Sequence, residues 1–292
     1  MSWRTVVITG IAKLDYNLGF MTVRKIDSVQ KVHISEIRIL IIESTSVSLT
    51  AALLCELTKS KVKIILCDAQ HNPFSEVCAY YGSHDTSGKV RQQIQWNKHC
   101  RELVWAEIIS EKIRKQRNHL QALNKNEAAN LLNQYIEEIV PGDKTNREGH
   151  AAKVYFNALF GLDFTRSAET SINAELNYGY GILLSFFTRE IACSGYITQL
   201  GLSHDNMFNQ FNLASDLMEP FRIIVDRKVV SDNSVKFEHD EKMSMLDLFN
   251  SYVAIDGKRQ IIGNAIGVYC RSVFDALNEN DVSLIRFYSD EL

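Results

Sequence analysis

The sequence predicts an α+β protein in two parts, a small N-terminal β-rich, β-sandwich-like domain and a larger all-α domain that follows it. The first part is rich in β-branched and aromatic residues with partial alternation, whereas apolar residues recur at helical spacing in the second. A run containing proline, glycine and serine separates the two patterns. We therefore predict a β-rich domain over residues 1–73, a linker over 74–88 and an all-α domain over 89–292.

Within the first domain the segments alternate between strand and helix patterns. RTVVITG, AKLDYNLGFMTVRK and QKVHISEIRILIIES are expected to form strands, because they combine β-branched and aromatic residues with alternating polarity. SVSLTAALLCELTKS is expected to form a short helix of small and apolar residues, and KVKIILCDA a further strand.

The second domain is expected to consist of helices alone. Residues 89–123 have the periodicity of one long helix, and the nearly all-apolar segment SINAELNYGYGILLSFFTREIACSG predicts a central one. Two of its glycines, Gly179 and Gly181, are expected to permit close helix packing. Further helices are expected in NEAANLLNQYIEEIV, TNREGHAAKVYFNALFG, FNLASDLMEPF, KMSMLDLFNSYVAI and KRQIIGNAIGVYCRSVFDALN.

The composition is that of a globular protein without a membrane span. Of 292 residues, 46% are hydrophobic and 23% charged, and no run of apolar residues is long enough to cross a bilayer. The start shows no secretory core, and the six cysteines form no close pairs, so a cytoplasmic protein is expected. The net charge of −3 argues mildly against a general nucleic-acid binder, although residues 89–120 hold eight Lys or Arg against three acids. Residues 238–292 hold five against ten.

Glu148 has two interpretations. With Thr145 it has the S/T-x-x-E spacing of a capping box, in which its carboxylate would satisfy backbone N–H groups at a helix start. It also heads a stripe that is otherwise apolar, with Ala152, Tyr155 and Leu159 below it. A carboxylate that faces inward is costly to bury unless it is paired or binds a metal ion.

The stretch SHDNMFNQFNLASDLMEPFR has a polar side that carries Asn212, Asp216 and Glu219. An ordinary solvated helix face explains this pattern, yet Asp216 and Glu219 are helix-surface neighbours whose charges repel unless a cation lies between them. Pro220 predicts a kink or the start of a new helix at this point. His204, which precedes the helix, would complete a donor set that suits Mn²⁺, Mg²⁺ or Zn²⁺.

Other chemistry has weaker support. The pairs His84-Asp85 and His239-Asp240, together with His204-Asp205, suggest a helical HD-like metal phosphohydrolase, although two of the three pairs lie in loop-like sequence. No phosphate-binding glycine loop and no GxSxG nucleophile motif is present in the sequence. A non-catalytic scaffold that binds nucleic acid is a third alternative.

The order Glu148, NAELNYGYGILL, GLSHDN and DLMEPFR resembles the CRISPR-associated spacer-acquisition integrase family over nearly the whole chain. The family's LN-Y-Y helix matches Leu176, Asn177, Tyr178 and Tyr180, and its DL-E-FR signature matches Asp216, Leu217, Glu219, Phe221 and Arg222. The short β-rich part and the SHDN context look most like the integrases of type II systems.

This resemblance implies a metal-dependent DNA endonuclease and integrase, in which Mg²⁺ or Mn²⁺ is held by Glu148, His204 and Glu219. Many members have aspartate at the last position, where this chain has glutamate. Asp216 would be an alternative ligand or a support, and Asn177, Tyr178 and Asn212 are further candidates around the site. Arg147, Lys153, Arg189 and Arg222 are candidate DNA contacts.

The implied reaction is transesterification, in which the 3′-hydroxyl ends of protospacer DNA attack phosphodiesters of the CRISPR repeat. The implied partners are double-stranded DNA, a second copy of the chain that joins through the β-rich domain, and a small CRISPR adaptation protein that bridges two dimers. Other type II CRISPR proteins are further possible partners.

Overall fold

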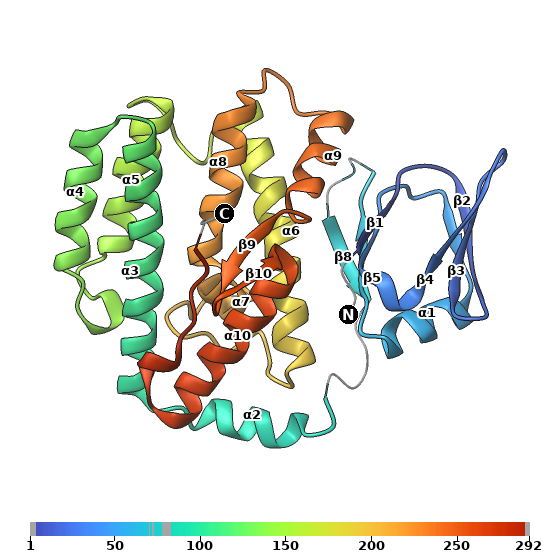
Figure 1. Ribbon diagram of the computed structural model, residues 1–292, viewed down its shortest axis with the longest axis horizontal. Coiled ribbons are helices and arrows are strands. Elements are labelled where there is room, and N and C mark those ends of the chain that lie inside the picture. The colour runs from blue at the N-terminus through green and yellow to red at the C-terminus, as the bar shows by residue number, and fades with distance from the viewer. Residues whose placement is uncertain (1–3, 70, 72, 78–82, 290–292) are drawn as a thin grey trace.

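The computed structural model describes residues 4–69, 71, 73–77 and 83–289 and has the predicted fold class, a β-rich part followed by a mainly helical part (Figure 1). Residues 78–82 of the predicted linker lie outside the described residues. The last strand of the β-rich part, β8 (Pro73–Val77), and the first helix after it, α2 (Thr86–Ile94), flank that gap. The exact domain boundaries therefore stay predictions.

In its described residues, the β-rich domain consists of two four-stranded sheets and the α-helix α1 (Ala51–Lys59), besides a short 3-10 turn. The sheet orders are β1-β5-β7-β8 and β4-β3-β2-β6; β1, β5 and β7 run parallel, and β2, β3 and β4 form an antiparallel meander. The remaining strands are β1 (Arg4–Ile8), β2 (Ala12–Asn17), β3 (Phe20–Arg24), β4 (Val29–His33), β5 (Ile37–Ile42), β6 (Val47–Leu49) and β7 (Lys63–Cys67).

Strand β5 explains how this domain meets the helices. All six of its residues are buried, because both of its faces are covered. Leu40 and Ile42 belong to the core between the two sheets and α1, whereas Ile39 and Ile41 pack into the core of the helical domain. The β-rich domain and the helical domain are therefore in direct apolar contact.

Two buried cations reinforce this junction. The ammonium of Lys63 on β7 donates to Thr188 Oγ1 at 2.8 Å, and the guanidinium of Arg38 on β5 pairs with Glu190 at 3.3 Å. Arg38 also donates to the carbonyl of Gly263 at 2.5 Å. A charged side chain is tolerated in such a place because its polar partners replace water.

The helical domain is built around α6, which the sequence predicted as its centre (Figure 1). The helices α7, α8, α9 and α10 pack against α6, and α4 and α5 lie against α3 on the far side from the β-rich domain. The helices are α3 (Lys98–Ala122), α4 (Asn126–Glu137), α5 (Arg147–Phe160), α6 (Ser171–Cys193), α7 (Asn212–Leu217), α8 (Arg222–Asp232), α9 (His239–Leu248) and α10 (Ile262–Glu279). The described residues also include the short 3-10 helices η1 (Ile34–Glu36), η2 (Pro141–Asp143), η3 (Glu219–Phe221) and η4 (Val282–Leu284).

Three helices predicted in the second domain are wrong in detail. The stretch 89–123 is not one helix but α2 and α3, because Asn97 caps a new helix by accepting from the Cys100 amide at 3.2 Å. The region 252–261 is not helical but a hairpin of β9 (Tyr252–Ile255) and β10 (Lys258–Ile261). Asp256 and Gly257 both have positive φ, as the tight turn of such a hairpin requires.

In the part of the chain that the structure describes, no helix combines the length and the apolar character that crossing a membrane would require.

Candidate metal and catalytic site

Glu148 lies in the first turn of α5 but does not cap that helix. The capping residue is Asn146, which accepts from the Gly149 amide at 3.3 Å, and the carboxylate of Asp143 accepts from the amides of Arg147 and Glu148 at 2.8 and 2.9 Å. The expected capping box of Thr145 and Glu148 is therefore wrong. With the helix start already satisfied, the Glu148 carboxylate is free to point away from its own backbone.

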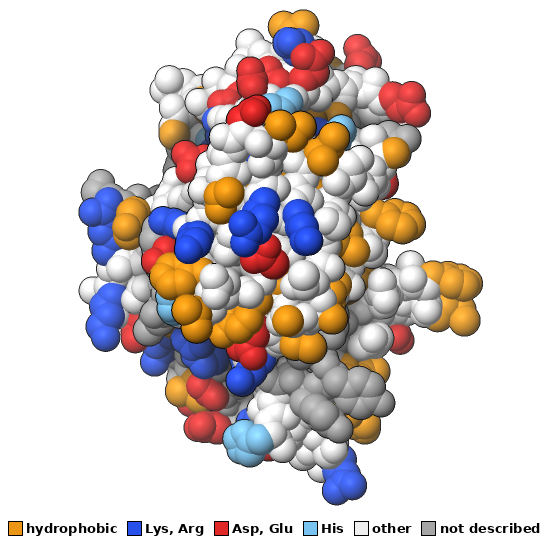
Figure 2. Space-filling model, turned by 90° about the vertical axis from the view of Figure 1, so that its right-hand side faces the viewer, with side chains coloured by type: hydrophobic (Ala, Val, Ile, Leu, Met, Phe, Trp, Pro, Cys, Tyr) orange, Lys and Arg blue, Asp and Glu red, His pale blue; other side chains and the backbone are white. Residues whose placement is uncertain are grey.

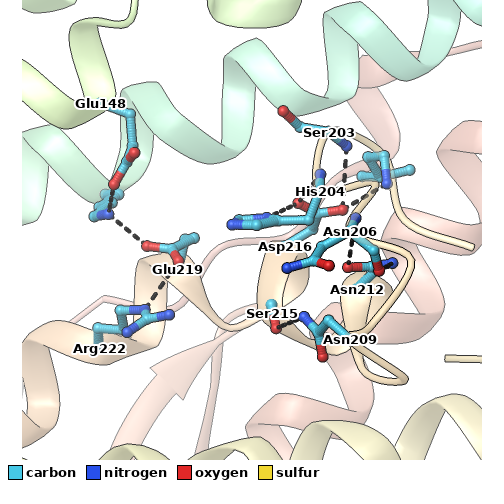
Figure 3. Close-up of polar contacts among 12 residues, drawn as sticks. Glu148, Ser203, His204, Asn206, Asn209, Asn212, Ser215, Asp216, Glu219 and Arg222 are labelled. Atoms are coloured by element: carbon cyan, nitrogen blue, oxygen red, sulfur yellow. Dashed lines mark hydrogen bonds and ion pairs between the residues drawn. The ribbon is translucent and has the colours of Figure 1, made fainter. Parts of the chain in front are cut away.

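That carboxylate points toward Glu219, which comes from a different segment (Figure 3). Glu219 lies in η3, the short turn between α7 and α8 that Pro220 introduces, and its side chain is only 4% exposed. The predicted break at Pro220 is thus confirmed. Because the helix is interrupted, Glu219 is directed into the protein rather than along the surface of α7.

A lysine lies between the two carboxylates. The ammonium of Lys112 on α3 forms an ion pair with Glu148 and another with Glu219, the latter at 2.5 Å, and its side chain is 8% exposed. Burial lowers the pKa of Lys112, but the carboxylates of Glu219 and Glu148 outweigh this effect, and the net shift is upward. Lys112 therefore carries its charge.

The second oxygen of Glu219 faces Arg222, whose Nε lies 2.9 Å from Oε1. Burial would raise the pKa of Glu219, yet Arg222 and Lys112 hold it below its ordinary value. The Arg222 guanidinium also covers the ring of Tyr180 at 4.7 Å, and Tyr180 donates to the buried carboxylate of Asp226. The pair of carboxylates is thus embedded in a connected polar network.

His204 approaches the same region from the loop before α7. Figure 3 shows its imidazole directed toward Glu219, while Nδ1 lies 2.6 Å from Oδ1 of Asp216. The hydrogen bond to Asp216 raises the pKa of His204, and the charges of Glu219 and Glu148 act in the same direction. When Nδ1 donates to a carboxylate, Nε2 keeps its lone pair, which is the usual arrangement of a metal-binding histidine.

Asp216 is completely buried and anchors the loop that carries His204. Its carboxylate accepts from the amides of Leu202 at 2.5 Å, Ser203 at 3.2 Å and His204 at 3.1 Å, in addition to the imidazole. A glycine is required next to it, because a Cβ at Gly201 would lie 2.6 Å from Asp216 Oδ2. The loop is therefore shaped around one carboxylate.

The donor types fit a divalent cation, since two carboxylates and one imidazole suit Mg²⁺ or Mn²⁺. The two carboxylates also converge already on one positive charge, the Lys112 ammonium. Across the described ranges, however, no group of three or more His, Cys, Asp or Glu side chains is close enough to hold a metal ion. Closing such a site thus requires the Lys112 ammonium to move and His204 to approach.

Asn212, Asn177 and Tyr178, which the sequence also predicted for the site, have different surroundings. Asn212 donates to the carbonyls of Gln199 at 3.0 Å and Asn206 at 3.1 Å, so it holds the loop of His204 (Figure 3). Asn177 accepts from Arg166 at 2.7 Å. Tyr178 is buried with its ring 5.4 Å from that of Phe237, on the side of α6 where α9 packs.

The four predicted DNA contacts also differ in their surroundings. Lys153 is exposed on α5, and Arg147 pairs with Glu138 at 2.9 Å near the surface. The Arg189 guanidinium donates to the carbonyl of Lys61 at 2.9 Å, and the side chain is only 11% exposed. Arg189 thus joins the two domains, which leaves little of it available to DNA.

Sequence reasoning missed the contribution of α3. Trp105, Lys112 and His119 are spaced seven residues apart and lie on one stripe of this helix. Trp105 packs edge-on against His204 with ring centroids 5.9 Å apart, and His119 Nδ1 lies 2.8 Å from the hydroxyl of Tyr155. The sequence did contain a signal for this contribution, because Lys112 stands at an inward-facing position one turn after the apolar residues Ile108 and Ile109.

Comparison with known proteins identifies the family of this chain. Residues 6–248 match the family described as CRISPR associated protein Cas1. A CRISPR-associated endonuclease Cas1 from Neisseria meningitidis is 31% identical over 230 residues, which cover 79% of this chain and 76% of that protein. The chain therefore belongs to the Cas1 family.

Solved structures agree on the fold. A casposase bound to an integration product superposes with a TM-score of 0.76 at 18% identity and covers 97% of this chain and 93% of its own. A chain of a Cas6-RT-Cas1–Cas2 complex has a TM-score of 0.74 at 16% identity; the match covers 99% of this chain but 36% of that longer one.

Proposed function

We propose that this protein is a metal-dependent DNA endonuclease and integrase of CRISPR adaptation, which joins 3′-hydroxyl ends of protospacer DNA to the CRISPR repeat by transesterification. The observation that carries the proposal is the convergence of Glu148 and Glu219, from separate segments, on one cation position beside His204. The similarity to a Cas1 endonuclease and to a casposase described as bound to its integration product supports it.

In this proposal Glu148, Glu219 and His204 hold Mg²⁺ or Mn²⁺. The ion would polarise a phosphoryl oxygen and make the attacking hydroxyl more acidic. The protein supports this arrangement by fixing the imidazole through Asp216, which leaves Nε2 as an acceptor, and by keeping Glu219 ionised beside Arg222. Trp105 limits the tilt of the His204 ring.

DNA would approach the exposed side of this site, where His204 keeps 44% and Glu148 32% of its side-chain surface accessible. Arg147, which adjoins Glu148 in sequence, and Lys153, which is exposed on the same helix, are the candidate phosphate contacts on α5. Affinity that rests on phosphate contacts falls with salt concentration. The net charge of −3 does not oppose this, because charge is unevenly distributed along the chain.

Insertion of a two-ended DNA segment needs two such sites, so we propose a homodimer that forms through the β-rich domain and is bridged by a small adaptation protein. The description of a similar chain as part of a Cas1–Cas2 complex supports a partner of this kind. Figure 2 shows hydrophobic side chains among Lys and Arg on the side of the molecule that the β-rich domain forms. Leu18, Ile26 and Phe74 of that domain are 85%, 90% and 79% exposed.

The test is a strand-transfer assay with a short DNA duplex and a plasmid that carries a repeat, in Mg²⁺ or Mn²⁺. We expect Glu148→Ala, His204→Ala and Glu219→Ala each to reduce strand transfer at least 100-fold, on the order of the loss from removing one electrostatic element of a catalytic site. Asp205→Ala is the matched control, because this exposed acid adjoins His204 without a proposed role.

If the three site variants fold and bind DNA within about twofold of wild type, their loss of strand transfer is a loss of the chemical step. Unchanged strand transfer by Glu219→Ala would refute the proposed site. Release of phosphate from small nucleotides without DNA joining would favour the phosphohydrolase, and DNA binding without chemistry in any metal ion would favour the scaffold.

A further inference from the structure

The carboxylates at the proposed site are already neutralised in full by the protein's own cations. Glu148 pairs with Lys112, and Glu219 pairs with Lys112 through one oxygen and with Arg222 through the other. Two acidic and two basic side chains thus form a cluster without net charge. This neutrality explains how Glu219 remains ionised although its side chain is only 4% exposed.

A divalent cation cannot simply be added to this cluster. Bound by the same two carboxylates, it would introduce two positive charges beside an ammonium that is only 8% exposed, where little water is available to screen the repulsion. Lys112 also occupies the space between the carboxylates, since its Nζ is in contact distance of both. Charge and space therefore both oppose simultaneous binding.

We propose that Lys112 is an internal counter-ion that occupies the cation position and competes with the metal ion. It holds Glu148 and Glu219 together in the metal-free protein, and its ammonium must withdraw when the ion binds. This inference rests on the proposed function, because it assumes that the two carboxylates are metal ligands. Its consequence is a metal affinity lower than the two carboxylates alone would give.

The two cations of the cluster differ in how they are held. Lys112 is anchored through its α3 backbone and is flexible along four carbons, whereas Arg222 is additionally held over the Tyr180 ring at 4.7 Å. Of the two cations, Lys112 is the one that contacts both carboxylates. Withdrawal of Lys112 would leave Arg222 on Glu219, so the bound ion would face one fewer positive charge.

The experiment measures Mn²⁺ binding by the full-length protein without DNA, through the electron paramagnetic resonance signal of free Mn²⁺ at fixed pH and salt. Lys112→Met keeps the length and apolar volume of the side chain and removes its charge. We expect the Kd for Mn²⁺ to fall at least tenfold. We also expect a lower melting temperature without metal and a larger rise on adding Mn²⁺, because the ion replaces a missing counter-charge.

Lys63→Met is the matched control. Lys63 is also a buried lysine paired with a glutamate, Glu76, but it lies on β7 at the domain junction. We expect this variant to lose stability while its Kd for Mn²⁺ stays within about twofold of wild type. A general effect of removing a buried lysine is thereby separated from an effect at the cation position.

Lys112→Arg provides the opposite change, because its planar guanidinium keeps the charge and can bridge two carboxylates more rigidly. We expect Lys112→Arg to bind Mn²⁺ at least threefold more weakly than wild type. If Lys112→Met does not fold, the Kd of Lys112→Arg decides whether Lys112 competes with the metal ion. If wild type binds Mn²⁺ and Lys112→Met binds it no more tightly, the role of Lys112 is overturned while the metal site stands. Tighter Mn²⁺ binding by Lys112→Arg than by wild type would have the same meaning. Absence of Mn²⁺ binding by wild type and Lys112→Met would overturn the metal site and this inference together.

Discussion

Two glycines of α6 provide a direct test of how tightly this helix packs against its neighbours. A Cβ at Gly179 would lie 2.5 Å from Val225 Cγ1 on α8 and 3.0 Å from Met245 Sδ on α9. A Cβ at Gly181, half a turn further on, would meet nothing within 4 Å. The same substitution to alanine should thus have opposite effects at two positions of one helix.

The magnitude follows from two opposing contributions. Alanine is favoured over glycine in a helix interior by about 1 kcal/mol. At Gly181 this gain stands alone, and we expect stabilisation of about 0.5–1 kcal/mol. At Gly179 the methyl enters a filled space, which costs ~1–3 kcal/mol in a packed core. Val225 cannot swing aside cheaply because β-branching restricts its χ1.

We therefore expect Gly179→Ala to lose up to about 2 kcal/mol net, and the two variants to differ by roughly 1–3 kcal/mol, the cost of the methyl group in the filled space. Guanidinium-induced unfolding followed by far-ultraviolet circular dichroism measures the difference. Because α8 begins at Arg222, directly after η3, displacement of α8 should also lower strand transfer by Gly179→Ala more than by Gly181→Ala. Equal or greater stability of Gly179→Ala relative to Gly181→Ala would refute the packing argument.

Two further predictions concern buried carboxyl groups. Asp216→Ala removes the acceptor of three amides, so we expect faster hydrogen exchange at residues 202–204 and a stability loss of about 2–4 kcal/mol; unchanged exchange there would contradict the anchoring role. Burial and the nearby Asp232 raise the pKa of Glu175 from 4.5 to about 7. The native state therefore binds the Glu175 proton more strongly than the unfolded chain does, and wild-type stability falls as the pH rises from 4.5 through 7. Between pH 5 and pH 8, Glu175→Gln should gain roughly 2–3 kcal/mol relative to wild type by chemical denaturation, and a difference independent of pH would contradict the shift.

The sequence predicted those elements whose signals are local. The helix α6 follows from its unbroken apolar pattern, and the interruption at Pro220 follows from the missing backbone donor. The hairpin of β9 and β10 also had a local signal, the Asp256-Gly257 pair between two short β-like runs, which the helical periodicity of the flanking segments obscured. The break between α2 and α3 was similarly indicated by Asn97, a favourable capping residue.

The site was less predictable, because its contacts join residues that are far apart in the chain. Lys112 lies 36 residues before Glu148 and meets it only when α3 and α5 pack together. Asp143 could be identified as the acceptor for the start of α5 only once the turn at η2 was known. No periodicity in the sequence encodes either contact, so the local capping pattern of Thr145 and Glu148 was the simplest interpretation and a wrong one.

The pair Asp216 and Glu219 shows how the fold resolves a conflict that the sequence only poses. Two like charges three residues apart on a helix repel, and a shared cation was one expected solution. The structure instead gives each carboxylate its own counter-groups, because the break at Pro220 turns Glu219 toward Lys112 and Arg222 while Asp216 stays with the loop.

This separation also distinguishes the two acids chemically. Both oxygens of Asp216 are occupied, Oδ2 by the amides of Leu202 and Ser203 and Oδ1 by the amide and the imidazole of His204. A carboxylate offers about four acceptor positions, so Asp216 has none left for a metal ion unless the loop reorganises. Among the described residues, Glu219 pairs with the cations Lys112 and Arg222, which another cation can replace. In the proposed site, Glu219 is thus the carboxylate that remains open to a metal ion, and Asp216 would serve the site by fixing His204.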